Sequence, residues 1–176
     1  MKYLIMTEGV CEKGLLDVLL KRGLLIYSYS DLLYQEIFHA RQITFKLLEM
    51  INQLPPQEMI TIIRIGDKLS DELDLSEVED RVTDQRKICI KPEFEILHVI
   101  NEGMFDGYQK VKNKQKVCEY YLINNQSYRK TYDFNYSYFD EMSDEELVAL
   151  LKHYDIKRKG CHKKGEMTIT SIIRGC

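Results

Sequence analysis

Two carboxylates stand beside glycines at the ends of the two most strand-like segments of the chain. Residues 3–9 read YLIMTEG, an apolar run that stops at Glu8, and residues 58–67 read EMITIIRIGD, which ends at Asp67. In a parallel α/β sheet, functional groups gather beyond the carboxyl ends of the strands. If these two strands are neighbours, Glu8 and Asp67 project into one crevice. Hard oxygen ligands of this kind suit Mg²⁺ or Mn²⁺.

Asp71 is the third candidate for this site. It follows Asp67 by four positions and faces the same way if the segment turns helically. Carboxylates held close together repel each other, so they need a cation or a shared proton. The alternative for each acid alone is structural: Gly66-Asp67 forms a turn, and Glu8 is an acid favoured by a helix dipole. The equivalent positions of the two acids favour the metal site.

The elements that must position these acids are read from apolar periodicity and turn residues. In the first half, the pattern predicts strands over 2–7, 24–29 and 58–67, and helices over 12–22, 30–38 and 43–54. Gly23 is expected to end the first helix, Ser30 to cap the second, and Pro55-Pro56 to end the third. An acidic connector follows over 67–86.

The second half is less regular but contains two well-marked helix ends. The pattern predicts a strand over 86–90, helices over 93–103, 115–125 and 144–154, a strand or loop over 128–139, and a short helix or strand over 165–175. Pro92 is expected to open the first of these helices and Gly103 to end it. Ser143 and Glu146 form a capping box for the last helix. Strands alternating with helices predict an α/β domain with a mostly parallel central sheet flanked by helices.

Charge is distributed unevenly, although the net charge is only -3. Residues 66–84 carry eight acids against two basic residues, whereas residues 109–116, QKVKNKQK, carry four lysines and no acid. An acidic centre flanked by basic segments suits a metal site that serves a polyanion, and the alternative is a set of solvated faces. Alternate spacing places three of the lysines on one side of an extended segment. The candidates for contact with phosphates are Arg41, Lys110, Lys112 and Lys114.

Cysteine usage and hydropathy indicate the compartment. The five cysteines are scattered and form no CxxC pair, and the apolar run after Lys2 is too short for a secretory signal or a membrane span. We therefore expect a cytoplasmic protein with reduced thiols and no membrane partner. Cys11 lies at the start of a helix, where a thiolate is expected to be favoured, but no adjacent histidine marks it as a nucleophile.

The ordered set of TEG, IGDKLSDELD and CIKPEFEILHVINEG resembles a TOPRIM (topoisomerase-primase) domain. That Rossmann-like sandwich has a glutamate-glycine after its first strand and a pair of aspartates after a later one. The family pair is separated by one residue, so Asp71 or Asp74 takes the second place here. The segment from Pro92 to Glu95 resembles the P-x-F-E segment of TOPRIM-like proteins of the RloB type and related phage-defence nucleases. The resemblance covers residues 1–105.

The resemblance implies Mg²⁺-dependent or Mn²⁺-dependent hydrolysis of nucleic-acid phosphodiester bonds. It implies that Glu8 is a metal ligand or the general acid/base and that Asp67 and Asp71 hold the metal, so that all three are catalytic. It also implies a division into a metal-binding core over 1–105 and a basic helical extension over 106–176 that packs on it. Phage defence is the implied setting.

Glu95, His98 and the Cys161-His162 pair are further candidates outside this set of three acids. Glu95 and His98 form a single E-x-x-H pair, whereas di-iron bundles need two copies, so we expect Glu95 to line the crevice or to orient a basic residue there, and His98 to be structural. Cys161-His162 lacks the second pair that zinc needs.

Two non-enzymatic interpretations compete with the nuclease. One is a binding module of the same fold whose metal site has decayed, and the loose GDKLSD spacing supports it. The other is a regulatory protein that engages a protein partner through its acidic stretch. The sequence leaves open the choice between DNA and RNA, the oligomeric state and the identity of any partner.

Overall fold

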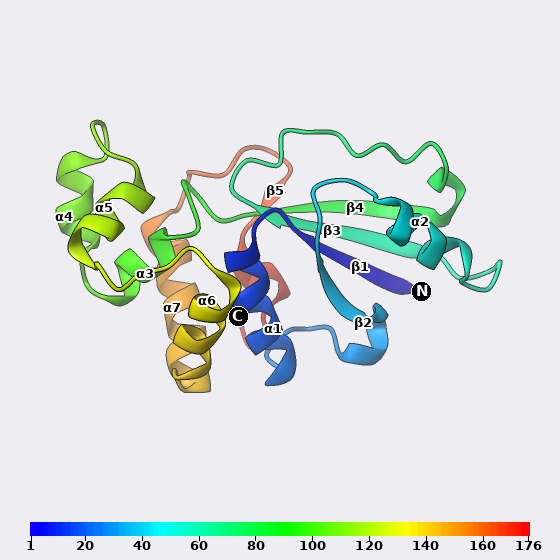
Figure 1. Ribbon diagram of the computed structural model, residues 1–176, viewed down its shortest axis with the longest axis horizontal. Helices are drawn as coiled ribbons and strands as arrows, with labels where there is room; N and C mark the ends of the chain where they lie inside the picture. Colours follow the sequence, from blue (N-terminus) through cyan, green and yellow to red (C-terminus); the bar gives the residue numbers. More distant parts are fainter.

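The computed structural model describes residues 1–176 and contains one parallel sheet of five strands (Figure 1). The strands are β1 (Lys2–Thr7), β2 (Leu32–His39), β3 (Ile60–Gly66), β4 (Val82–Cys89) and β5 (Glu166–Met167). Their order is β2-β1-β3-β4-β5, and every neighbouring pair is parallel. The chain therefore has the predicted α/β fold, a Rossmann-like arrangement of a parallel sheet with helices on both faces.

Alternate side chains of the central strands enter two separate cores, as the period of a strand requires. Ile5 and Ile63 belong to a large core of 33 buried residues, whereas their neighbours Leu4 and Ile62 belong to a core of nine on the other face. The helices are α1 (Val10–Lys21), α2 (Phe45–Asn52), α3 (Ile96–Asn101), α4 (Phe105–Val111), α5 (Val117–Asn124), α6 (Tyr132–Asp140) and α7 (Asp144–Lys157). Leu47 and Ile51 of α2 enter the small core, and Figure 1 shows α1, α6 and α7 together on the opposite side of the sheet. None of the helices is long and apolar enough to cross a membrane.

Several elements form where local sequence signals predict them. The strands β1 and β3 and the helices α2, α5 and α7 lie within or close to the expected ranges. Gly23 has a positive φ of 68° directly after α1, the conformation that favours glycine at a helix end. At α7, Glu146 N donates to Ser143 Oγ at 3.2 Å and Ser143 N donates to Glu146 Oε2 at 2.7 Å, which completes the predicted capping box.

The interpretation of residues 24–38 is wrong in both parts. Residues 24–29 form no strand of the sheet, and the predicted helix over 30–38 is largely the strand β2. Tyr34 and Gln35 have positive φ values of 50° and 58°. The resulting bulge lets six residues of β2 span three of β1, since Leu32 pairs with Tyr3 and Ile37 pairs with Ile5. The bulge disrupts the alternation that would otherwise identify a strand.

Three other element predictions need correction. Residues 132–140 form α6 rather than a strand or loop, with Thr131 Oγ1 accepting from Phe134 N at its start. The strand β4 begins at Val82, four residues before the predicted Arg86. Helix α3 begins at Ile96 rather than directly after Pro92.

The sheet and the large core continue across the predicted boundary at residue 105. The strand β5 pairs with β4 at the sheet edge through Lys87–Glu166 and Ile88–Met167. Residues of α7 and of the 3-10 helix Ile169–Ile172 belong to the large core. The two other 3-10 helices are Tyr29–Asp31 and Glu79–Arg81. The segment 106–176 thus supplies both helices and an edge strand.

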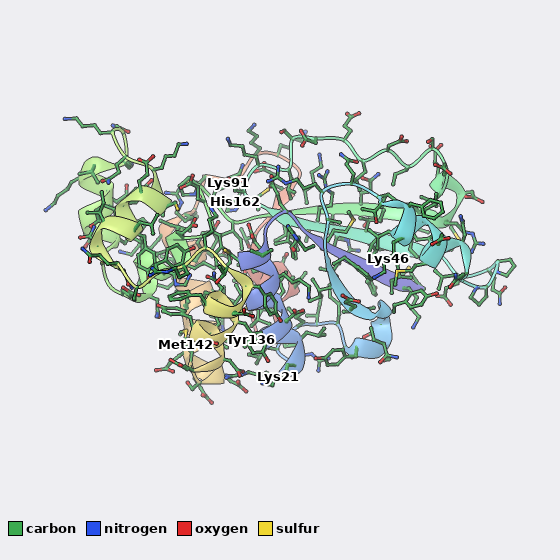
Figure 2. All side chains as sticks on the ribbon, viewed as in Figure 1. Lys21, Lys46, Lys91, Tyr136, Met142 and His162 are labelled. Carbon is green, nitrogen blue, oxygen red and sulfur yellow. The ribbon has the colours of Figure 1, made fainter.

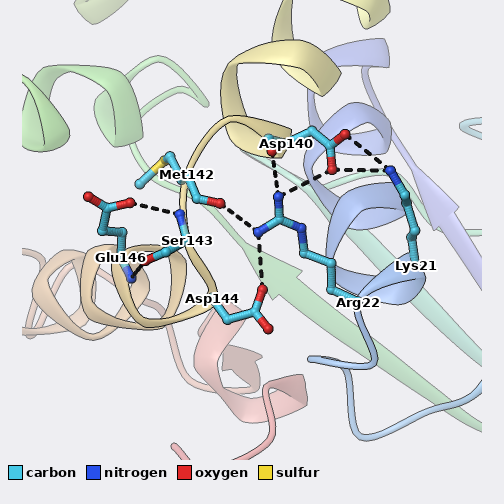
Figure 3. A network of polar contacts seen from close by, with 7 residues as sticks. All are labelled: Lys21, Arg22, Asp140, Met142, Ser143, Asp144 and Glu146. Carbon is cyan, nitrogen blue, oxygen red and sulfur yellow. Dashed lines mark hydrogen bonds and ion pairs between the residues drawn. The ribbon is translucent and has the colours of Figure 1, made fainter.

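Arg22 anchors the end of α1 to the connection between α6 and α7 (Figure 3). Its Nη1 donates to Met142 O at 2.5 Å and lies 3.0 Å from Asp144 Oδ1. Its Nη2 donates to Asp140 O, and Lys21 Nζ lies 3.1 Å from Asp140 Oδ2. These contacts hold the helix that follows Glu8 against the C-terminal half of the chain.

Candidate functional site

Glu8 and Asp67 lie at the same edge of the sheet, the one formed by the carboxyl ends of the strands. The strands β1 and β3 are neighbours with Thr7 paired to Ile65, and Glu8 N donates to Ile65 O at 2.8 Å. Glu8 therefore lies opposite Gly66, and Asp67 comes directly after it. Both acids line two adjoining cavities of about 380 and 360 Å³.

Three cavities meet at this edge, and Asp67 lines all of them. The central cleft is lined by Glu8, Gly9, Val10, Cys11, Glu12, His39, Arg41, Asp67, Glu93, Phe94 and Lys130. The aspartate pocket is lined by Glu8, Arg41, Arg64, Asp67, Lys68, Leu69, Ser70 and Asp71. The lysine cleft, of about 520 Å³, is lined by Asp67, Lys68, Pro92, Glu93, Tyr108, Lys112, Asn113, Lys114, Gln115, Lys116, Val117 and Glu119.

The two glycines beside the acids make room for carboxylates. A Cβ at Gly66 would lie 2.5 Å from Glu8 Oε2, and a Cβ at Gly9 would lie 2.4 Å from Glu12 Oε2. At Gly66 the added atom would also lie 2.7 Å from Glu8 Cβ, so this position favours glycine, whereas at Gly9 it would meet only the end of the flexible Glu12 side chain, which can shift. The glycine at the end of β3 therefore makes room for the acid at the end of the neighbouring strand β1.

One oxygen of Glu8 has no partner in the protein. Oε1 lies 3.4 Å from Nη2 of Arg41, whereas Oε2 is buried and makes no hydrogen bond. A buried carboxylate oxygen without a partner is costly, and buried charges are normally paired or coordinate metal ions. Glu8 Oε2 is thus oriented and available for a cation.

Asp71 reaches the aspartate pocket by a route that the sequence does not show. Residues 67–71 contain bends at Asp67 and Asp71 rather than a helical turn, and Leu69 has a positive φ of 41°. Arg64, a buried residue of β3, donates from Nη1 to Asp71 O at 2.5 Å and from Nη2 to Arg41 O at 3.3 Å. Arg64 therefore ties together the two loops that carry the pocket, a role that the sequence analysis missed.

Glu12 is a second residue that the sequence analysis missed. It lies in the first turn of α1, is only 7% exposed and lines the central cleft. Burial, together with the nearby charges of Glu95 and Asp67, raises the pKa of Glu12 to about 7. The sequence feature that could have identified Glu12 as buried is its spacing, because Glu12 lies on the same helical stripe as the buried residues Leu15, Leu16 and Leu19.

Glu95 lies behind the wall of the central cleft and holds a lysine. It is fully buried, and its Oε1 lies 3.1 Å from Lys130 Nζ and accepts a hydrogen bond from Tyr128 Oη at 2.9 Å. Burial alone would raise the pKa of Glu95, but Lys130 and the hydrogen bonds outweigh it, so this pKa lies below its ordinary value. Lys130 itself lines the cleft, as one of the basic residues that the sequence analysis did not single out.

The predicted phosphate-contacting residues divide into two groups. Arg41 lines the central cleft and the aspartate pocket, and Lys112 and Lys114 line the lysine cleft. Lys110 lies in α4 and lines none of the three cavities. The prediction of an extended segment here is wrong, because residues 105–111 are helical and residues 112–114 form a turn.

The contacts and burial of the remaining candidate groups favour structural roles. His98 is buried, and its Nε2 lies 2.8 Å from Asn135 Oδ1 among aromatic rings. The exposed Cys161 and the neighbouring His162, whose Nε2 is 2.9 Å from a backbone carbonyl, form no zinc site. Burial raises the pKa of Cys11 to about 12, so the expectation of a favoured thiolate is wrong.

The donor set fits a magnesium-like ion rather than a fully protein-bound metal. No group of three or more His, Cys, Asp or Glu side chains is arranged to hold a metal ion. Mg²⁺ commonly takes only one or two protein carboxylates and fills its other positions with water and substrate phosphate. Glu8 and Asp67 can supply these two carboxylates. The central cleft also carries four carboxylates, including Glu12 and Glu93, against two permanent cations.

Comparisons of the chain with family models, curated proteins and solved structures found no match.

Proposed function

We propose that the protein is a metal-dependent nuclease that hydrolyses phosphodiester bonds of nucleic acids. The observation that supports this most directly is the buried Glu8 Oε2, which has no partner and lies at the sheet edge beside Asp67. In this proposal Glu8 and Asp67 would hold Mg²⁺ or Mn²⁺, and Asp71 is the third acid that lines the same pocket. When bound, such an ion would act as a Lewis acid toward a phosphate oxygen. The TOPRIM-like motifs add the setting of phage defence to the proposal.

The residues of the central cleft supply the other functions that hydrolysis needs. Arg41 contacts Glu8 and leaves its exposed guanidinium for a phosphate, since this side chain is 67% exposed. Glu12 is suited to proton transfer because a carboxyl group with a pKa near 7 both accepts and donates a proton at neutral pH. A water molecule in the cleft would lose its proton to Glu12.

The lysine cleft provides a path for the rest of a polyanion. Lys112 and Lys114 line it with Lys68 and Lys116, and Asp67 joins it to the proposed metal site. Lysines bind the nucleic-acid backbone mainly through charge, which provides affinity without reading the bases. The proposed substrate is therefore a nucleic-acid strand selected by its backbone.

A non-catalytic binding or regulatory module is the second candidate. The observation that favours it is the absence of three converging metal-binding side chains. Titration with Mn²⁺ or Mg²⁺ separates the two candidates, because an ion that binds only the folded protein raises its melting temperature. A rise in the wild type that Glu8→Gln and Asp67→Asn both abolish supports the nuclease, whereas no rise in the wild type supports the module.

Cleavage assays on three variants test the proposed activity. Glu8→Gln and Asp67→Asn remove a proposed ligand charge, whereas Asp80→Asn removes an equal charge from an exposed residue outside the three cavities. We expect the first two variants to lose more Mg²⁺-dependent cleavage than the roughly 10–100-fold typical of outer-shell changes. Asp80→Asn should cleave like the wild type. Wild-type rates in both Glu8→Gln and Asp67→Asn would contradict the proposal.

A further inference from the structure

Lys130 enters the central cleft from the C-terminal half of the chain. It belongs to the connection between α5 and α6, and its side chain is 61% exposed. An exposed lysine is usually mobile, but the ammonium of Lys130 lies 3.1 Å from Oε1 of Glu95, a residue with no exposed surface. A buried carboxylate thus holds the ammonium of a side chain that lines the cleft.

The anchor behind Lys130 is itself held in place. Tyr128 is 1% exposed and donates its hydroxyl hydrogen to the same oxygen of Glu95. Its ring packs against Tyr121 at 4.9 Å and His98 at 5.3 Å between centroids. The other oxygen of Glu95 has no partner, so Lys130 is the only cation that compensates this buried charge. If Lys130 moved away, the buried charge of Glu95 would be left uncompensated, which is costly. This cost keeps the ammonium of Lys130 beside Glu95.

The ammonium retains donors for a ligand after it has bound Glu95. A lysine has three N–H donors and no acceptor, and one donor serves Glu95. Arg41 and Lys130 are the permanent cations of the central cleft, and they lie among carboxylates. A phosphate in this cleft would therefore contact Lys130, which precedes α6, and the proposed metal ion, which would lie at the ends of the strands β1 and β3.

We propose that Lys130 contacts a non-bridging phosphate oxygen of a nucleic-acid strand in the central cleft and that Glu95 and Tyr128 are positioning residues for it. This inference rests on the proposed function and adds a substrate contact to it. Lys130 acts as a point charge on the backbone, so the contact is independent of base sequence.

Binding of a fluorescently labelled single-stranded oligonucleotide without divalent metal tests the contact. Lys130→Ala is compared with Lys130→Arg and with Lys46→Ala, which removes an exposed lysine on α2 (Figure 2). Loss of one phosphate contact should weaken binding about tenfold at low salt and reduce the slope of log affinity against log salt by about 0.7–0.9. Lys130→Arg should retain most of the affinity, and Lys46→Ala should match the wild type.

The positioning role is tested by a different readout. Glu95→Gln keeps the size of the side chain and the charge of Lys130, so the salt slope should stay at the wild-type value while kcat for cleavage falls. Glu95→Gln should add nothing further in a Lys130→Ala background, because both changes act on one contact. Tyr128→Phe is the milder second variant, and thermal melting checks that each variant folds.

The possible outcomes distinguish this inference from the proposed function. Wild-type affinity and salt slope in Lys130→Ala overturn it, as do independent effects of Glu95→Gln and Lys130→Ala or a wild type that does not bind the oligonucleotide. If Glu8→Gln abolishes cleavage while Lys130→Ala binds normally, only this inference fails. If Glu8→Gln cleaves normally, the nuclease proposal fails, and the metal-free binding measurement still decides the role of Lys130.

Discussion

Glu12 lines the central cleft and Glu95 lies behind its wall, and the pKa values of these two buried carboxylates move in opposite directions. Burial, together with the charges of Glu95 and Asp67, raises the pKa of Glu12 to about 7, and Glu12 makes no ion pair that would offset this. Glu95 is also penalised by burial, but Lys130 reverses the effect. A pair of titratable groups separated in this way is typical of sites that transfer protons. In the proposed nuclease, Glu12 is therefore the group suited to proton exchange, and Glu95 carries a fixed charge.

The raised pKa of Glu12 predicts a specific dependence of stability on pH. The folded state holds the proton of Glu12 more tightly than the unfolded state, whose carboxyl has a pKa of 4.5. The free energy of unfolding should therefore fall as pH rises from about 4.5 to about 7, by up to about 3 kcal/mol, and stay low above that range. Glu12→Gln should lack this loss and be more stable than the wild type at pH 8.

Urea unfolding in EDTA at pH 5 and pH 8 measures the effect. Glu49→Gln is the matched control, because Glu49 is an exposed glutamate of α2 outside the three cavities. Its stability should change with pH as that of the wild type does. If the free energy of unfolding of Glu12→Gln also fell between pH 5 and pH 8 as that of the wild type does, Glu12 would not be the group that titrates in this range. The lowered pKa of Glu95 contributes only at the acid end, because its stabilisation is lost as pH falls below the ordinary carboxyl range.

The relative position of α1 and α6 sets the width of the central cleft. Glu8 immediately precedes the α1 region, and Lys130 immediately precedes the α6 region, so the two sides of the cleft meet through these helices. Gly14 of α1 lies directly against α6: a Cβ there would be 2.9 Å from Tyr136 N and 3.1 Å from Tyr132 O. Backbone atoms of a helix cannot move aside independently, so this contact requires glycine.

Gly14→Ala should consequently destabilise the protein. Overpacking of a tight contact costs about 1–3 kcal/mol, and the roughly 1 kcal/mol that alanine gains over glycine in a helix offsets part of it. Gly107→Ala is the control within α4, because the added Cβ meets only the terminal hydroxyl of Tyr120, which can shift. Chemical unfolding should show a loss for Gly14→Ala and no loss for Gly107→Ala. Equal stability of both variants would mean that α1 and α6 separate without cost.

Across the whole molecule, opposite charges meet at one sheet edge although the net charge is only -3. Glu8 and Asp67 come from the ends of β1 and β3, whereas three of the four lysines of the lysine cleft come from the connection between α4 and α5. Asp67 and Glu93 line both the central cleft and the lysine cleft. A strand that reaches the proposed metal site would therefore extend along the lysines.

Removal of three lysines should reduce the salt dependence of nucleic-acid binding without affecting the chemistry. The combined change of Lys112, Lys114 and Lys116 to alanine should lower the salt slope by about 2–3 and leave kcat unchanged. The control replaces Lys159, Lys163 and Lys164, which line none of the three cavities and carry the same total charge. Equal slopes for the two triple variants would contradict a role for the lysine cleft.

The local signals of the sequence determined the elements that depend on few neighbours. Apolar runs predicted β1 and β3, and turn and cap residues predicted the end of α1 at Gly23 and the start of α7 at Ser143. The placement of Glu8 and Asp67 beyond two strand ends also follows from these runs. Such features are local because hydrophobic period and backbone preference act within one or two turns of chain.

Tertiary contacts alone decided the rest. The strand β2 forms at residues predicted to be helical because β1 offers it a parallel partner and the bulge at Tyr34 adjusts its register. Lys130 and Glu12 enter the same cleft because α1 packs on α6, and no spacing in the sequence encodes that contact. Burial, which raises the pKa of Glu12 and gives Glu95 its need for Lys130, arises only when distant segments exclude water from the same volume.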